Sequence, residues 1–253
     1  MEKRNLVIVH SFPTNSVLLQ GLTDFLSDYF NVYMIDLPGF MPDVLPLKEI
    51  SLEGYRRYVK EKIESFDLKT YWMAGVSFGF LVVDGIRDDK CLGFLAIEPY
   101  INSEFLKMSK FKKFAYIFII SIVGGTGIYK KIWGSRLLKF LLGKEYRKRM
   151  DILFSTIDAR TFFETAKFIL KDKKFPVFQD KPYVLVVNKK DLTIFSDKTI
   201  SFFKKKANNL EIIFSTSEHY PQHMTKEYFQ KHISEKEVGR MREFLESAES
   251  KKF

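Results

Sequence analysis

The stretch Met73-Ala74-Gly75-Val76-Ser77-Phe78-Gly79-Phe80-Leu81 predicts the fold of this chain more directly than any other part of the sequence. It places a serine between two glycines at G-x-S-x-G spacing, directly after an apolar segment. A serine on a tight turn between a strand and a helix needs small residues two positions away on each side, because the helix must pack close to the sheet. The pentapeptide is common, so its meaning depends on the elements around it.

Short apolar segments alternate with helical patterns along the chain. We expect strands at residues 6–9, 32–35, 70–74, 92–97, 183–187 and 210–214. Helices are expected at residues 17–30, from the capping residue Ser51 to Ile63, at 77–86 and at 234–253. This alternation predicts an α/β fold with a mostly parallel central sheet flanked by helices on both faces.

About eighty residues between the expected strands at 92–97 and 183–187 have a mainly helical pattern. We therefore predict a core formed by residues 1–100 and 176–253, and a helical cap insertion at residues 101–175. The insertion holds 17 Lys/Arg and 6 Asp/Glu, so it accounts for the whole positive excess of a chain with net charge +10. The two parts differ in surface chemistry.

Composition and the N-terminal residues narrow the class of protein. The chain has 253 residues, of which 46% are hydrophobic, and this suits one α/β domain with an insertion. The only cysteine, Cys91, lies in an apolar run, so we expect a buried, inert thiol and no disulfide within the chain. The apolar run at 6–9 is too short for a signal peptide, and we expect a cytoplasmic protein.

In this order, the elements resemble those of the α/β-hydrolase superfamily, of the serine esterase and lipase type with a helical cap. Residues 7–13, V-I-V-H-S-F-P, resemble the family's strand and His-Gly turn, and residues 35–40, I-D-L-P-G-F, resemble its next strand and turn. Residues 75–79 match the nucleophile elbow. Asp191 and His219 follow in the family's order Ser, Asp, His, so the resemblance spans nearly the whole chain.

The resemblance implies a catalytic triad of Ser77, Asp191 and His219. Serine is a weak nucleophile, so an imidazole must take its proton, and a carboxylate must orient the imidazole and stabilise its charged form. Glu98, at the end of an earlier strand, is the alternative acid, and His223 is the alternative histidine.

The resemblance also implies an oxyanion hole made by the backbone amides of Phe12 and Phe78. Their side chains, together with His10, would line the substrate pocket, and His10 would also shape the turn. The sequence departs from the family pattern at Ser11, Glu218 and Asn188, where glycine is usual. These departures affect loop geometry and leave each triad group in place.

A second family shares some of these motifs. Residues 184–191, V-L-V-V-N-K-K-D, resemble the N-K-x-D segment of GTPases, and residues 36–39 fit their D-x-x-G motif. Nucleotide hydrolysis also needs a G-x-x-x-x-G-K-[ST] loop around the phosphates. The turn at residues 10–16 has no glycine or lysine, and Gly143-Lys144 is followed by Glu145, so we set this reading aside.

The residue at the elbow separates the remaining reaction types. Epoxide hydrolases and haloalkane dehalogenases resemble the same scaffold but attack with aspartate, whereas serine favours acyl transfer to water. We therefore expect cleavage of a carboxylic ester, thioester or amide of a fairly hydrophobic acyl substrate, with no metal or organic cofactor. The alternative is a non-catalytic protein of the same fold that binds a hydrophobic ligand.

The insertion contains an unusually apolar run at residues 114–123, F-A-Y-I-F-I-I-S-I-V. It is too short to cross a bilayer. Basic residues lie on both sides of it: Lys107, Lys110, Lys112, Lys113, Lys130, Lys131 and Arg136, with Arg147, Lys148 and Arg149 further on. Two hypotheses remain open: contact with an anionic membrane or a lipophilic acyl chain, or a cap helix buried against the core. No nucleic-acid-binding motif is recognisable.

Overall fold

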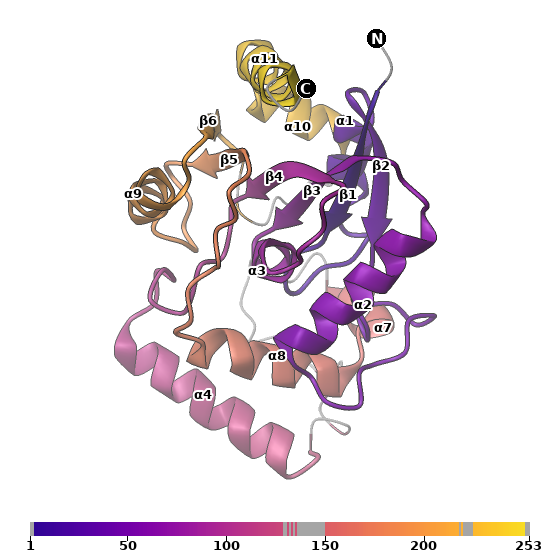
Figure 1. Ribbon diagram of the computed structural model, residues 1–253. Helices are drawn as coiled ribbons and strands as arrows, with labels where there is room; N and C mark the ends of the chain where they lie inside the picture. The colour runs from indigo at the N-terminus through magenta and orange to yellow at the C-terminus, as the bar shows by residue number, and fades with distance from the viewer. Residues whose placement is uncertain are drawn as a thin grey trace.

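The computed structural model describes residues 3–128, 131, 133, 135, 150–217, 219 and 225–250. Its centre is a six-stranded sheet in the order β2-β1-β3-β4-β5-β6, and every neighbouring pair is parallel (Figure 1). The strands are β1 (Arg4–Val9), β2 (Phe30–Ile35), β3 (Tyr71–Val76), β4 (Cys91–Ile97), β5 (Tyr183–Asn188) and β6 (Leu210–Ser215). The predicted fold class is confirmed, and each expected strand is present within two residues of its predicted ends.

Helices cover both faces of the sheet because the strands are apolar on both sides. Val7 and Val9 of β1 pack on the face covered by α2 (Leu52–Ser65), α3 (Phe78–Asp84) and α9 (Ser196–Lys206). Leu6 and Ile8 alternate with them and pack on the face covered by α1 (Gln20–Leu26), α10 (Lys226–His232) and α11 (Glu235–Ser250). Cys91 is buried in the first of these cores, as predicted.

Two helix starts illustrate how local hydrogen bonds set the boundaries. The side chain of Ser51 accepts a hydrogen bond from the amide of Gly54, so it caps α2 as predicted. The helix expected from residue 17 begins only at Gln20. Asn15 holds the intervening residues in a turn, because its side-chain oxygen accepts from the Leu18 amide and its carbonyl accepts from the Leu19 amide.

The described part of the segment between β4 and β5 contains three helices: α4 (Lys110–Gly125), α7 (Met150–Thr156) and α8 (Ala159–Lys171). Figure 1 shows α4 beside α8 at the opposite end of the molecule from α11, and α4 contacts α8. Loop residues before α4 are tied to the core, because Leu106 forms an isolated bridge with Ile194 and the Lys107 amide donates to the Thr193 carbonyl. No helix among the described residues is long and apolar enough to span a bilayer.

Candidate active site

Ser77 occupies the sharp turn between β3 and α3. Its backbone has φ 47° and ψ −112°, a strained conformation for a residue with a side chain. The two flanking glycines are required by close approaches: a Cβ at Gly75 would lie 2.3 Å from the backbone nitrogen of Phe80, and one at Gly79 would lie 2.4 Å from the carbonyl oxygen of Val9. The predicted tight turn is therefore present, and it holds the serine at the carboxyl end of β3.

Ser77, His219 and Asp191 form a continuous hydrogen-bonded chain. His219 Nε2 lies 3.3 Å from Ser77 Oγ, and His219 Nδ1 lies 2.6 Å from Asp191 Oδ2. Asp191 follows β5 and His219 follows β6, so the carboxyl ends of the parallel strands bring together residues far apart in the sequence. The structure thus brings together the three residues that the sequence predicted for a triad.

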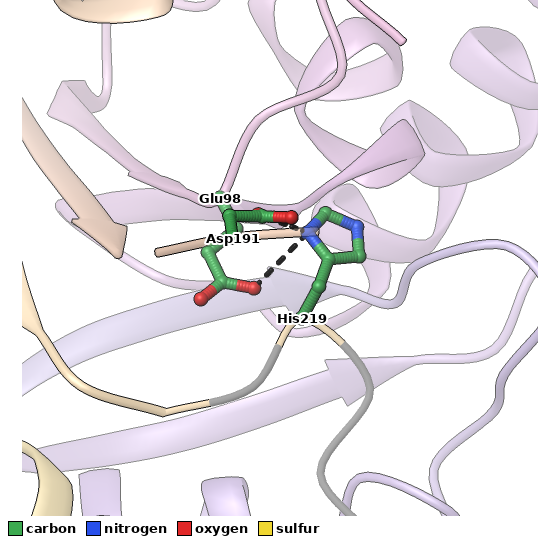
Figure 2. A group of neighbouring side chains, drawn as sticks. All are labelled: Glu98, Asp191 and His219. Carbon is green, nitrogen blue, oxygen red and sulfur yellow. Dashed lines mark hydrogen bonds and ion pairs between the residues drawn. The ribbon is translucent and has the colours of Figure 1, made fainter. Parts of the chain in front are cut away.

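A second carboxylate faces the same imidazole nitrogen. Glu98 follows β4 in a left-handed backbone conformation, with φ 44°, and its Oε2 lies 3.2 Å from His219 Nδ1. Figure 2 shows Glu98 and Asp191 directed at this one atom. Asp191 makes the shorter contact, and its other oxygen accepts from the amides of Thr193 and Ile194 at 2.6 and 3.1 Å. The geometry therefore favours Asp191 as the acid that orients the histidine.

Burial and charge shift the pKa values of these groups in opposite directions. Burial lowers the pKa of His219, but hydrogen bonds and negative charge from Asp191 and Glu98 outweigh it and raise the pKa to about 10. Burial acts to raise the pKa of Asp191, yet its bonds to His219 and to backbone amides hold that pKa below the usual value. Burial raises the pKa of Glu98. Glu98 is therefore the first of the two carboxylates to take up a proton as the pH falls.

Glu98, Asp191 and His219 also offer three potential metal ligands within 4.8 Å of one another. A tetrahedral zinc ion held at ordinary bond lengths would keep its nitrogen and oxygen ligands about 3.3 Å apart. The 2.6 Å separation between His219 Nδ1 and Asp191 Oδ2 is that of a direct hydrogen bond. The residues present therefore fit a hydrogen-bonded cluster better than a metal centre.

Asn188 connects the loop that carries the acid with the loop that carries the histidine. Its side-chain oxygen accepts from the Lys190 amide at 2.8 Å, and its side-chain nitrogen donates to the carbonyl of Ser217. The hydroxyl of Ser217 in turn donates to Glu98 Oε1 at 3.4 Å. The sequence analysis noted Asn188 as a departure from glycine and as part of the N-K-x-D resemblance, and no local signal indicated this bridging role.

The side chain of His10 is hydrogen-bonded to the turns that follow β1 and β2. Its Nδ1 donates to the Ser11 carbonyl at 2.8 Å and its Nε2 accepts from the Leu37 amide at 2.9 Å, so the ring is neutral and links the turns after β1 and β2. Burial lowers its pKa, in keeping with the neutral form. The side chain has no exposed surface, and these contacts position the loop without presenting the ring to a pocket.

Aromatic residues of α8 pack against the two residues predicted to supply oxyanion-hole amides. The ring of Phe12 lies 5.2 Å from that of Phe162, and the ring of Phe78 lies 6.1 Å from that of Phe168. Phe78 is the first residue of α3, so its amide has no acceptor within the helix. The segment between β4 and β5 therefore forms an apolar wall beside Ser77.

Among the described residues, the other two histidines, His10 and His232, take no part in this cluster. His232 pairs through Nδ1 with the hydroxyl of Thr216 at 2.8 Å, at the surface. His223, the predicted alternative to His219, lies outside the described residues, as does Glu218. His219 is therefore the histidine that the structure places beside Ser77.

Comparison with solved structures shows the α/β-hydrolase fold. The chain is similar to a thermophilic esterase from Thermogutta terrifontis, with TM-score 0.65 and 15% identity over 97% of this chain and 90% of the esterase. It is also similar to the haloalkane dehalogenase DbeA from Bradyrhizobium elkani, with TM-score 0.66 and 13% identity over 98% and 92%. An alpha/beta hydrolase fold protein from Burkholderia ambifaria gives 0.62 and 16% over 89% and 88%. No family model and no curated protein sequence matches the chain.

Proposed function

We propose that this protein of the α/β-hydrolase fold is a serine hydrolase that cleaves a carboxylic ester of a fairly hydrophobic acyl substrate through an acyl-enzyme. The observation that carries the proposal is the chain of hydrogen bonds from Ser77 Oγ through His219 to Asp191, built on a turn with positive φ. A serine in this arrangement is activated for attack by the adjacent imidazole.

In the acylation step, Ser77 Oγ attacks the carbonyl carbon of the ester while His219 Nε2 takes the hydroxyl proton. Asp191 accepts the hydrogen bond from His219 Nδ1 and stabilises the imidazolium. The tetrahedral intermediate collapses, the bond to the leaving oxygen breaks, and His219 returns its proton to the alcohol. Water then attacks the acyl-enzyme with the same histidine as base, releasing the carboxylic acid and restoring Ser77.

The amides of Phe12 and Phe78 are the proposed donors to the oxyanion. Phe12 lies in the turn after β1, and Phe78 directly follows the nucleophile. These are the two places from which this fold supplies such donors. The packing of Phe162 and Phe168 against these two residues supports an apolar acyl group, because the wall beside the nucleophile is aromatic.

A serine rather than an aspartate at the elbow separates this chain from the chemistry of the dehalogenase that it resembles in fold. Alkyl halides and epoxides are opened by attack at a saturated carbon, and the resulting ester on aspartate is then hydrolysed. The same attack by serine would form an ether, which water could not hydrolyse in this way. We therefore propose an acyl compound as the substrate, with an ester as the first class to test.

Covalent labelling tests the proposal directly. We expect a fluorophosphonate probe to add once to the folded protein, as measured by intact mass, and to leave the Ser77→Ala variant unmodified, because labelling needs an activated serine and an oxyanion hole. p-Nitrophenyl esters of rising chain length then rank the acyl group. If the folded protein is not modified by the probe and cleaves no ester, the proposal is overturned in favour of a non-catalytic ligand-binding protein.

A further inference from the structure

The outward face of α4 is apolar although it faces solvent. Five large side chains form this face: Phe111, Phe114, Phe118, Ile119 and Ile122, with exposed fractions of 82%, 69%, 59%, 40% and 47%. Their spacing places them on one side of the helix, because successive residues are separated by 100°. Ile120 and Val123, on the other side, pack against the core. The helix is therefore packed against the core on one side and exposed to solvent on the other.

Lysines border the α4 face, and no acidic residue lies among them. Lys110 and Lys112 are exposed and flank Phe111 on either side of the helix, while Lys107 precedes the helix and Lys131 follows it, both exposed. Lys112 Nζ lies 5.6 Å from the centre of the Tyr116 ring. The sequence between Glu104 and Glu145 contains nine basic residues and no aspartate or glutamate. Among the described residues, the lysines next to the apolar face in the sequence therefore have no acidic residue between them.

The groove beside α4 extends this charge toward α8. It has a volume of about 750 Å³ and includes Ile120 of α4 in its lining. Its basic side chains are Arg160, Lys167, Lys171, Lys173 and Lys174, set against the acids Glu164 and Asp172. The groove therefore adds a net positive charge next to Ile120, on the side of α4 that faces α8.

We propose that the α4 face docks on an anionic lipid surface. The helix has 16 residues and is about 24 Å long, so it would lie in the plane of the surface. The phenylalanines and isoleucines would enter the boundary between headgroups and acyl chains, and the lysines would contact lipid phosphates or carboxylates. The apolar face can be buried among the lipids, and the lysines can pair with their negative charge.

Charge also argues against a second copy of the chain as the occupant. A symmetric pair would bring the same surface patch from both copies together. Neither α4 face offers an acidic side chain to pair with the lysines of the other copy. An anionic bilayer offers an apolar interior to the phenylalanines and isoleucines, and negatively charged headgroups to the lysines.

Vesicle co-sedimentation of the full chain tests this proposal. We expect the protein to bind phosphatidylcholine vesicles containing 30 mol% phosphatidylserine at least ten-fold more tightly than pure phosphatidylcholine vesicles, and less tightly in 0.5 M NaCl, because salt screens the lysines. Phe114→Ser/Phe118→Ser and Lys110→Glu/Lys112→Glu should each weaken binding at least ten-fold. Ser77→Ala should bind like the wild type, so the result does not depend on the proposed activity.

Two controls make substitutions of the same kinds away from α4. Phe214→Ser removes a partly exposed phenylalanine beside Lys189 on β6, and Lys204→Glu/Lys205→Glu makes the same charge change on α9. Both should bind within two-fold of the wild type, and circular dichroism checks that all variants fold. Equal binding to neutral and anionic vesicles, equal loss in the controls, or a concentration-dependent dimer that only the α4 variants abolish would overturn the proposal.

Discussion

Glu98 Oε2 lies 3.2 Å from Nδ1 of His219, although Asp191 already occupies that nitrogen at 2.6 Å. The two acids come from the ends of neighbouring strands, β4 and β5, so the sheet delivers both to one atom. Each acid was a candidate from the sequence alone, and in the structure both contact the histidine. The histidine is held in a more negative environment than a single acid would provide.

The second carboxylate should displace the pH dependence of ester hydrolysis. The base form of His219 is needed for catalysis, so kcat/KM should rise with pH through the pKa of this residue, which the two acids raise. Glu98→Gln removes one negative charge and should lower that pKa. We expect the acid limb of the profile to move at least about one pH unit lower, with activity at the optimum retained within about ten-fold. An unmoved limb would mean that the charge of Glu98 does not reach His219.

Asp191→Asn should have a different effect from Glu98→Gln. The asparagine amide has no negative charge to stabilise the imidazolium, and its NH2 group can donate to Nδ1, which favours the wrong tautomer of the histidine. We expect kcat to fall on the order of 10³- to 10⁴-fold, with a much smaller change in KM, measured with a p-nitrophenyl ester. If Glu98→Gln caused the larger loss instead, the assignment of the two acids would be reversed.

Gly79 should tolerate no larger residue. A Cβ there would lie 2.4 Å from the carbonyl oxygen of Val9 and 2.6 Å from that of His10, and neither backbone atom can move without displacing β1. We expect Gly79→Ala to lower the free energy of unfolding by about 3 kcal/mol or more, measured by urea denaturation. Gly239→Ala in α11 is the control, because a Cβ there meets nothing within 4 Å and should stabilise the helix by about 0.5–1 kcal/mol.

The strands and the turn at Ser77 were predictable because their signals are local. Buried strands appear as short apolar runs, and the elbow needs glycines at fixed positions. The residues of the triad could be proposed from their order along the chain. Their mutual distances could not be derived, because each lies on a different strand end and depends on the register of the whole sheet. The start of α1 was missed because the Asn15 side chain competes with the helix for nearby amides.

The exposure of α4 could not be predicted from the sequence either. The apolar run and its lysines were visible in the sequence, but an apolar helix is equally suited to a buried site and to an exposed one. Only the packing of α4 on α8 decides which side chains face solvent. The bridge from Asn188 to Ser217 could not be predicted either, since Asn188 ends β5 and Ser217 lies beyond the end of β6.

Asn188 should matter for catalysis through the position of two loops. Asn188→Ala removes the donor to the Ser217 carbonyl and the acceptor for the Lys190 amide, so Asp191 and His219 should lose their fixed separation. We expect kcat to fall about 10- to 100-fold with KM nearly unchanged, because small misplacements of catalytic groups are costly. Asn208→Ala removes one exposed side-chain hydrogen bond, to Asp180, and should leave kcat within about two-fold. Equal kcat values in the two variants would show that the bridge does not position the histidine.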